Sequence, residues 1–202
     1  MTPLSNDPTT EPLVLSLKEV DIPFPALQEN NPNVGRFTAS FIVFRQTTNS
    51  AKPQVLLIQR GHDGSWGGSW EVPGGGYEPG KDNTIMQTAL RETKEEAGVH
   101  ISPGAVLPLV YRTAFWHKES WIASYTFIAE VAEEVQITIS DEHLDWGFFD
   151  ENDIQGFGVY QKGEDQEGHV MLARKKGILR HFFTNRESLR NGDVDMQGHI
   201  EE

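Results

Sequence analysis

The most informative part of this chain is a glycine-rich loop, Pro73-Gly74-Gly75-Gly76, and the helical segment after it, which ends in Arg91-Glu92-Thr93-Lys94-Glu95-Glu96-Ala97-Gly98-Val99. At about 100° per residue, Glu92, Glu95 and Glu96 fall within an arc of about 100° on one side of a helix. The apolar residues occupy a neighbouring arc, and they are Ile85, Met86, Ala89, Leu90 and Ala97. We therefore predict a helix that buries one side and presents carboxylates beside it.

Three carboxylates on one stripe make such a helix less stable. Like charges three and four residues apart repel by about 0.2–0.5 kcal/mol per pair, and acids in the last turns oppose the negative end of the helix dipole. A cation bound between the carboxylates reverses both effects, which favours a metal site. The alternative is that glutamate is a good helix former and that the stripe only faces water. The helix taken alone leaves both interpretations open.

The composition excludes several classes of protein. The chain has 202 residues, enough for one domain with extensions, and it has no cysteine, which excludes disulfide scaffolds, thiolate nucleophiles and Cys-based metal sites. The formal net charge of -13 argues against a broad basic surface for a nucleic acid polymer, but not against a small phosphorylated substrate. No run approaches the ~18 apolar residues of a membrane span, and Met1 to Glu11 lack a signal pattern. We expect a cytoplasmic protein that binds no membrane.

Prolines and polar ends define the predicted organisation. Residues 1–35 are predicted to be an N-terminal extension or arm with local structure at most, because prolines interrupt the segment repeatedly. A single domain is predicted over residues 36–188, followed by a flexible C-terminal tail over residues 189–202. The arm and the exposed strands make a homodimer a further prediction.

Within the domain, apolar runs separated by turn residues indicate strand pairs on either side of the helix. The predicted strands are 37–44, 54–60, 70–72, 105–113, 121–131 and 144–149. A second helix is predicted within residues 168–186 from the spacing of its apolar residues. The order of strands, helix, strands and helix predicts a mixed sheet with helices packed on it, an α/β or α+β sandwich.

These residues resemble the box of the Nudix hydrolases, which runs Gly, five residues, Glu, seven residues and then Arg-Glu-hydrophobic-x-Glu-Glu-x-Gly-hydrophobic. Residues 91–99 match its second half, with Thr93 where an aliphatic residue is usual. Counting back from Arg91 places Asn83 at the first Glu position, after a glycine loop that is about one or two residues longer than the pattern. The resemblance covers roughly residues 36–155 and implies a Nudix-like α/β/α sandwich with a mixed β-sheet.

The resemblance also implies the chemistry. It implies a Mg²⁺-dependent hydrolase, with Mn²⁺ as the alternative ion, that cleaves the diphosphate linkage of a nucleoside diphosphate linked to another group. Glu92, Glu95 and Glu96, together with Gly75, are expected to form the metal site, since magnesium prefers hard oxygen ligands. Arg91 is expected to orient a carboxylate through a bidentate pair. Charge stabilisation and a metal-activated water make a protein nucleophile unnecessary.

The sequence offers more than one candidate for the catalytic base. Glu95 and Glu96 are candidates because they belong to the box. Glu142 is a third candidate, because family members often take an acid from a later loop and Asp141-Glu142-His143 precede the predicted last strand. The alternative for Glu142 is a solvated turn residue.

Substrate contacts are expected from Arg60 at a strand end, from the backbone of Gly74 and Gly75, and from Phe115 or Trp116 as a stacking surface. The alternatives are an exposed strand-end arginine and aromatic residues of the core. Basic residues of the last helix are expected to form a solvated, charge-balancing face rather than a phosphate site. They are Arg174, Lys175, Lys176, Arg180 and His181.

Two other functions stay open. A prenyl or other organic diphosphate is an alternative substrate, because the chain is rich in aromatic residues and lacks a motif that reads a base. A catalytically silent Nudix-fold binding or regulatory module is the other alternative, since Asn83, Thr93 and the longer loop depart from the box. The intact glutamates and Arg91 favour an enzyme.

Overall fold

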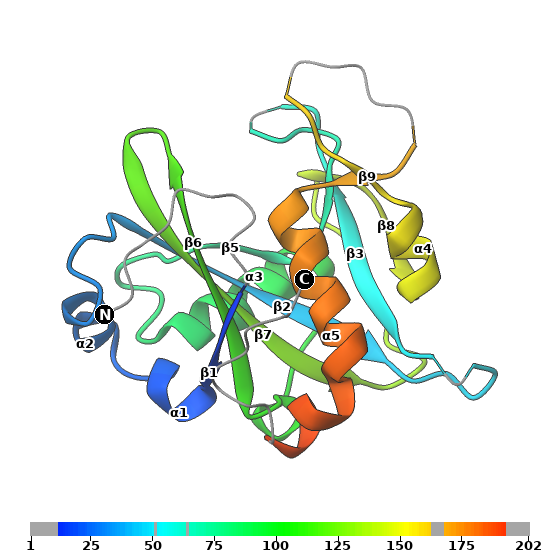
Figure 1. The fold of residues 1–202 in the computed structure, drawn as a ribbon, viewed down its shortest axis with the longest axis horizontal. Coiled ribbons are helices and arrows are strands. Elements are labelled where there is room, and N and C mark those ends of the chain that lie inside the picture. The colour runs from blue at the N-terminus through cyan, green and yellow to red at the C-terminus, as the bar shows by residue number, and fades with distance from the viewer. Residues whose placement is uncertain (1–11, 51, 64, 163–167, 193–202) are drawn as a thin grey trace.

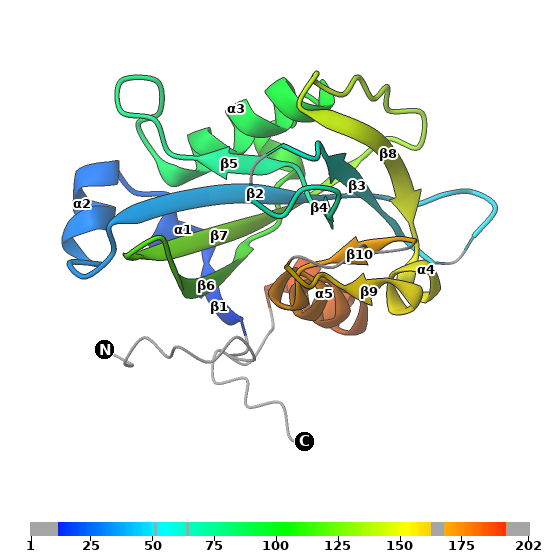
Figure 2. The ribbon, with the colours of Figure 1, turned by 90° about the horizontal axis from the view of Figure 1, so that it is seen from above.

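The computed structural model describes residues 12–50, 52–63, 65–162 and 168–192 (Figure 1). A mixed sheet lies between two helices, with α3 (Ile85–Ala97) on one face and α5 (Ala173–Asn191) on the other (Figure 2). The predicted α/β/α sandwich with a mixed sheet is therefore confirmed.

The sheet is built around a long parallel pair. Strand β2 (Arg36–Arg45) runs parallel to β7 (Ser120–Val131) and pairs antiparallel with β3 (Gln54–Arg60), which makes the sheet mixed. The strand order is β1-β6-β7-β2-β3-β4-β10-β9, with β5 paired to β2 and β8 paired to β3. The other strands are β1 (Leu13–Ser16), β4 (Trp70–Glu71), β5 (Gly74–Gly76), β6 (Leu109–His117), β8 (His143–Phe149), β9 (Gly158–Val159) and β10 (Val170–Met171). The shorter helices are α1 (Leu17–Val20), α2 (Phe24–Glu29) and α4 (Glu151–Gly156), and a 3₁₀ turn lies at Pro103–Ala105.

Alternation along β2 divides the core between the two helices. Phe44 packs on Phe182 of α5 with ring centroids 5.2 Å apart, whereas Phe41 and Val43 belong to the buried cluster that contains Ile85 of α3. Both faces of this strand are covered, and a strand buried on both faces needs apolar residues at consecutive positions. This explains why the apolar run in the sequence becomes continuous at the centre of the sheet.

Residues 12–35 are docked on the domain. Strand β1 extends the sheet by pairing antiparallel with β6. Val20, Leu27 and Val34 are buried in the cluster on the α3 side. This part of the expected arm therefore contributes to the core, while residues 1–11 lie outside the described part of the chain. The division of the chain into arm, domain and tail stays a prediction.

The last helix differs from its predicted bounds at both ends. It begins at Ala173, later than the apolar spacing indicated, and continues to Asn191. Leu189, the first residue of the expected tail, is buried, whereas residues 193–202 lie outside the described part. None of the described helices is long and apolar enough to cross a membrane.

Local signals begin and end α3. The hydroxyl of Thr84, which precedes the helix in an extended conformation, accepts a hydrogen bond from the Gln87 N–H at 3.3 Å. Gly98 ends the helix in the left-handed conformation with φ of 70°, which glycine adopts at little cost. The helix that carries the three glutamates is therefore delimited by its own sequence.

Candidate active site

Two of the three glutamates of α3 lie against the glycine strand β5. Gly74 donates its backbone N–H to Oε2 of Glu96 at 2.6 Å. A Cβ on Gly75 would lie 2.4 Å from Cδ of Glu92, and a Cβ on Gly74 would lie 2.4 Å from the carbonyl oxygen of Ala39. Glycine is therefore required at both positions, because any side chain would separate the strand from the carboxylates and from β2.

Glu96 is a buried carboxylate in a negative environment. It is 8% exposed, and burial, followed by repulsion from Glu71 of β4, raises its pKa to about 8. Nε2 of His143 lies 3.6 Å from Oε1 of Glu96. Because burial lowers the pKa of His143, the imidazole is neutral at pH 7 and the contact is not an ion pair. A carboxyl group with a pKa near neutrality is suited to exchange a proton during catalysis.

Arg91 binds Asp82, an acid of the loop before α3, whereas the count from Arg91 placed Asn83 at the first Glu position. Its Nε and Nη2 donate to Oδ1 and Oδ2 of Asp82 at 3.0 and 2.9 Å, and the Asp82 side chain is 2% exposed. Asn83, which the count placed at this position, is exposed. Asp82 follows Gly76 after five residues, as in the first half of the box, so the extra residue falls between Asp82 and Arg91. The loop therefore does contain a buried acid, Asp82, one position before the Asn83 that the count from Arg91 had given.

Hydrogen bonds keep this acid ionised. Burial alone would raise the pKa of Asp82, but hydrogen bonds from Arg91, from the backbone of Glu78 and from the hydroxyl of Thr88 outweigh burial and lower it. The guanidinium of Arg91 is thus fixed by a charged, fully bonded partner.

The same guanidinium holds two glutamates of α3. Nη1 of Arg91 donates to Oε1 of Glu92 at 2.9 Å and to Oε2 of Glu95 at 3.0 Å, and Nη2 donates to the carbonyl oxygen of Gly76 at 2.9 Å. Burial raises the pKa of Glu92 despite this contact. The Glu95 side chain is 52% exposed. Arg91 therefore links the glycine strand, the loop and the helix, which is the geometry that an orienting residue requires.

A cleft of about 280 Å³ adjoins these residues, and the three glycines of β5 line it. The rest of its wall comes from β2, the β3–β4 loop, the β6–β7 hairpin and the first turn of α5. Its charged lining residues in the described part of the chain are Arg36, Arg60, Glu71, Lys118, Arg174 and Lys175. Cations predominate, so the cleft suits an anion.

Two basic residues of the last helix line this cleft, so the predicted solvated face is wrong for Arg174 and Lys175. Nζ of Lys175 donates to Oγ of Ser40 at 3.4 Å, and burial lowers the pKa of this lysine to about 8. Lys176 instead donates to the backbone carbonyl oxygens of Gln155 and Phe157. The basic residues therefore have separate roles, and the first two face the cleft.

Of the other residues predicted for the site, Arg60 and Phe115 line the cleft, whereas Trp116 and Glu142 do not. Arg60 lines the cleft and forms an ion pair with Glu71. The negative charge of Glu71 raises the pKa of Arg60, and Glu142 contributes a smaller effect in the same direction. Phe115 lines the cleft, whereas Trp116, which follows it on β6, is 56% exposed and lies outside the lining. Glu142 is exposed in the turn before β8, and its backbone oxygen accepts a hydrogen bond from Gly61.

The carboxylates beside β5 suit a hard divalent cation. Repulsion from Glu71 and Glu92 contributes to the raised pKa of Glu96, and a cation between these groups would remove that repulsion. Within the described ranges, no three acids or histidines are already arranged as a metal centre, since Arg91 engages Glu92 and Glu95. The donor set fits a metal, and binding one requires these side chains to change partners.

Sequence reasoning missed several residues of this site. Asp82 had a local signal, because its distance from Gly76 equals the first spacing of the box. Glu71, His143, Arg174 and Lys175 come from three separate elements and meet only through strand pairing, so no local pattern marks them.

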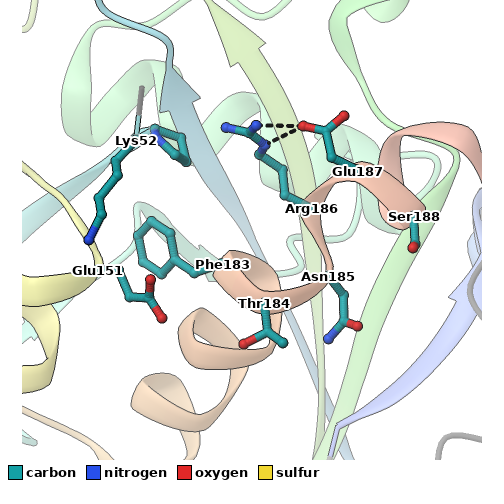
Figure 3. A pocket seen from close by; sticks show the side chains of 9 residues that line it. Lys52, Glu151, Phe183, Thr184, Asn185, Arg186, Glu187 and Ser188 are labelled. Atoms are coloured by element: carbon teal, nitrogen blue, oxygen red, sulfur yellow. Dashed lines mark hydrogen bonds and ion pairs between the residues drawn. The ribbon is translucent and has the colours of Figure 1, made fainter. Parts of the chain in front are cut away.

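A second hollow of about 220 Å³ lies over α5 and shares no lining residue with the cleft (Figure 3). The guanidinium of Arg186, which lines this hollow, donates hydrogen bonds to the carboxylate of Glu187 and to the side-chain oxygen of Gln46. Nζ of Lys52 donates to Asn152. Lys52 and Arg186, the cations of this hollow, are thus engaged by neighbouring side chains, and the glycine strand is not part of it.

The fold and the site together define a class of protein. The family profile described as NUDIX domain matches residues 36–183. The chain belongs to this family, which confirms the resemblance seen in the sequence.

Relatives of known name share part of the chain. The human "8-oxo-dGDP phosphatase NUDT18" is 39% identical over 77 residues, which are 38% of this chain and 23% of that protein. The "putative 8-oxo-dGTP diphosphatase 3" of Mycobacterium tuberculosis (strain H37Rv) is 29% identical over 121 residues, 59% of this chain and 55% of that protein. The chain thus spans between 23% and 55% of the length of these two relatives. The crystal structure of a MutT/nudix family protein from Enterococcus faecalis has the same fold, with a TM-score of 0.54 and 21% identity over 86% of this chain and 70% of that one.

Proposed function

We propose that this protein is a Mg²⁺-dependent hydrolase that cleaves the diphosphate linkage of a nucleoside diphosphate derivative, with Mn²⁺ as a substitute ion. One observation carries the proposal: the glycines of β5 touch the carboxylates of α3 and also line a cleft rich in cations. A diphosphate in this cleft has positive groups around its oxygens and lies next to acids that would hold a metal. Positioning and charge stabilisation of this kind account for most phosphoryl-transfer catalysis.

Glu92, Glu95, Glu96 and the backbone of Gly75 would hold the metal. When bound, the metal supplies charge neutralisation and lowers the pKa of a water. Arg91, fixed by Asp82, positions the carboxylates of α3. Glu96 is also a candidate base, because its pKa of about 8 allows it to accept and release a proton near neutral pH.

Glu142 and Glu95 remain the other candidates for the base. Glu142 is exposed near Arg60, and its neighbour His143 contacts Glu96, so the turn before β8 lies beside the site. A Glu142→Gln variant is expected to lose most of its kcat with a modest change in KM. An unchanged kcat would remove Glu142 from the role of base.

Arg60, Lys175 and the N–H groups of β5 are the proposed phosphate-binding groups, and Phe115 rather than Trp116 is the proposed aromatic contact. The names of two relatives, which refer to 8-oxo-dGDP and 8-oxo-dGTP, support a nucleoside derivative as substrate. The cytoplasmic location and the homodimer remain predictions.

A panel of diphosphates tests the proposal. Release of phosphate or nucleotide is measured with nucleoside diphosphate derivatives and with a prenyl diphosphate, each with and without Mg²⁺. We expect turnover of the nucleoside derivatives only with the metal. A preferred prenyl substrate would replace the proposed substrate class, and no turnover of any diphosphate would favour a silent binding module.

A further inference from the structure

One corner of the cleft is not engaged by the proposed metal and phosphate chemistry. Trp66, Phe115, His117 and Arg174 all line it. Cζ of Arg174 lies 3.9 Å from the ring centroid of Phe115 and 5.0 Å from that of Trp66. The ring centroids of Trp66 and His117 are 4.8 Å apart. Aromatic faces and a guanidinium therefore meet in one place.

The backbone holds Trp66 in an unusual conformation. Its φ of 62° lies in the left-handed region, which a bulky residue seldom adopts. The carbonyl oxygen of Trp66 accepts hydrogen bonds from the backbone N–H of Ser69 at 3.1 Å and from its Oγ at 2.7 Å. Gly68 donates to the carbonyl oxygen of Arg60 at the base of the same loop. Strain that the surroundings maintain in this way is typical of residues at ligand sites.

The guanidinium of Arg174 has hydrogen-bond donors without a protein partner in the described part of the chain. It makes no hydrogen bond to any residue within the described ranges, although the side chain is half-buried. Burial lowers the pKa of Arg174 to about 10, so the group is charged at neutral pH but poorly solvated. A guanidinium carries only donors, and its Cζ lies over the ring of Phe115, which offers no acceptor in its plane. A ligand that carries hydrogen-bond acceptors would therefore complete this corner.

We propose that this corner is a nucleobase subsite, in which the base stacks on Trp66 and presents its acceptor edge to Arg174, and that it selects guanine. The inference rests on the proposed function, which it deepens. Guanine offers two acceptors, O6 and N7, to an arginine, whereas adenine places an amino donor beside its single acceptor. A prenyl chain offers no acceptor and would leave the half-buried guanidinium unpaired.

The base preference of two variants tests the subsite. Values of kcat/KM are measured with Mg²⁺ for GDP, ADP and dimethylallyl diphosphate. We expect the wild-type protein to prefer GDP over ADP by about tenfold or more. In Arg174→Gln this preference is expected to disappear or to reverse, mainly through KM, because glutamine pairs with the N6 and N7 of adenine. Arg180→Gln, an exposed position on the same helix, serves as the matched control and is expected to retain the wild-type ratio.

Trp66→Gly removes the ring and keeps the left-handed backbone, because glycine adopts this conformation readily. The expected result is a rise in KM of about tenfold for both nucleotides, from loss of base stacking, with no fall in melting temperature. A GDP-to-ADP ratio unchanged in Arg174→Gln, or a nucleotide KM unchanged in Trp66→Gly, would overturn the subsite. The proposed function fails separately, if the wild-type protein hydrolyses no nucleotide.

Discussion

Helices α3 and α5 both carry charge at the end where the helix dipole disfavours it. Glu95 and Glu96 lie in the last turn of α3, and Arg174 and Lys175 lie in the first turn of α5. Each arrangement destabilises its helix by a few tenths of a kcal/mol to about 1 kcal/mol per group. A bound cation would remove the penalty at α3, and a bound phosphate would remove it at α5. Charge at the wrong end of a helix therefore indicates both halves of the site.

The two helices differ in what they are expected to do. In the proposed function the acids of α3 serve the reaction itself, whereas the cations of α5 serve substrate binding. Removing an α3 acid should then lower kcat, and removing an α5 cation should raise KM.

The largest expected effect is that of Glu96→Gln. The variant keeps the shape of the side chain but loses the charge that would hold a metal and the proton-accepting group, so kcat should fall by about 10³-fold. Turnover is measured at saturating GDP and Mg²⁺. Glu29→Gln, an exposed glutamate on α2, is the matched control. Full turnover by Glu96→Gln would disprove its role.

Asp82→Asn is expected to have the next largest effect. It removes the charge that fixes Arg91 and leaves the guanidinium half-paired, so we expect about 10–100-fold lower activity and a loss of about 3 kcal/mol in the free energy of unfolding. Activity and urea unfolding are measured for this variant and for Asn83→Ala. The adjacent Asn83 is exposed and should be silent. The reverse pattern would restore Asn83 to the position that the sequence count gave it.

Lys175→Met should raise KM by about tenfold and leave kcat nearly unchanged, since a hydrogen bond from a charged group to a phosphate contributes about 1.5–3 kcal/mol. The pH dependence supplies a second test. Because the pKa of Lys175 is lowered to about 8, the lysine is charged below that pH and neutral above it. KM of the wild-type protein should therefore rise as pH increases from 7 to 9. In Lys175→Arg the charge persists, and an equal rise in KM would exclude Lys175 as its cause.

The smallest expected effect is that of Phe24→Ala in the N-terminal arm. The Phe24 ring stacks on Tyr77, with centroids 3.4 Å apart and planes at 5°, and its N–H donates to the carbonyl oxygen of Asn83. The arm thus supports the loop that carries Asp82. We expect a loss of about 2 kcal/mol in stability, less than for a fully buried phenylalanine, and a less than about fivefold fall in kcat with KM unchanged. Urea unfolding measures the loss of stability, and steady-state kinetics measure kcat and KM. Leu13→Ala, at an exposed position of the same arm, serves as the control.

The acid half of the site was predictable because it is local. The periodicity that places Glu92, Glu95 and Glu96 on one stripe requires only that residues 85–97 form a helix, and Thr84 and Gly98 mark its ends. The mixed sheet followed from the order of the apolar runs. Asp82 was missed because the count from Arg91 assumed a fixed spacing, and one extra residue shifts it.

The basic half was not predictable in the same way. A helix that began at residue 168 would place Arg174 and Lys175 in its second turn, where the helix dipole has little effect on them. The helix begins instead at Ala173, so both cations lie in its first turn. Parallel pairing of β10 with β4 places this first turn beside Glu71, about 100 residues earlier in the chain. The choice between Phe115 and Trp116 depends on which face of β6 meets the cleft, and pairing with distant strands decides that face.

The central claim is that acids of α3 and cations of α5 form one reaction site. The most direct test measures kcat and KM for Mg²⁺-dependent GDP hydrolysis by the wild-type protein, Glu96→Gln and Lys175→Met under one set of conditions. We predict that Glu96→Gln lowers kcat with KM near the wild-type value, and that Lys175→Met raises KM with kcat near the wild-type value. Turnover without a divalent metal, or two variants that both match the wild-type protein, would contradict the claim.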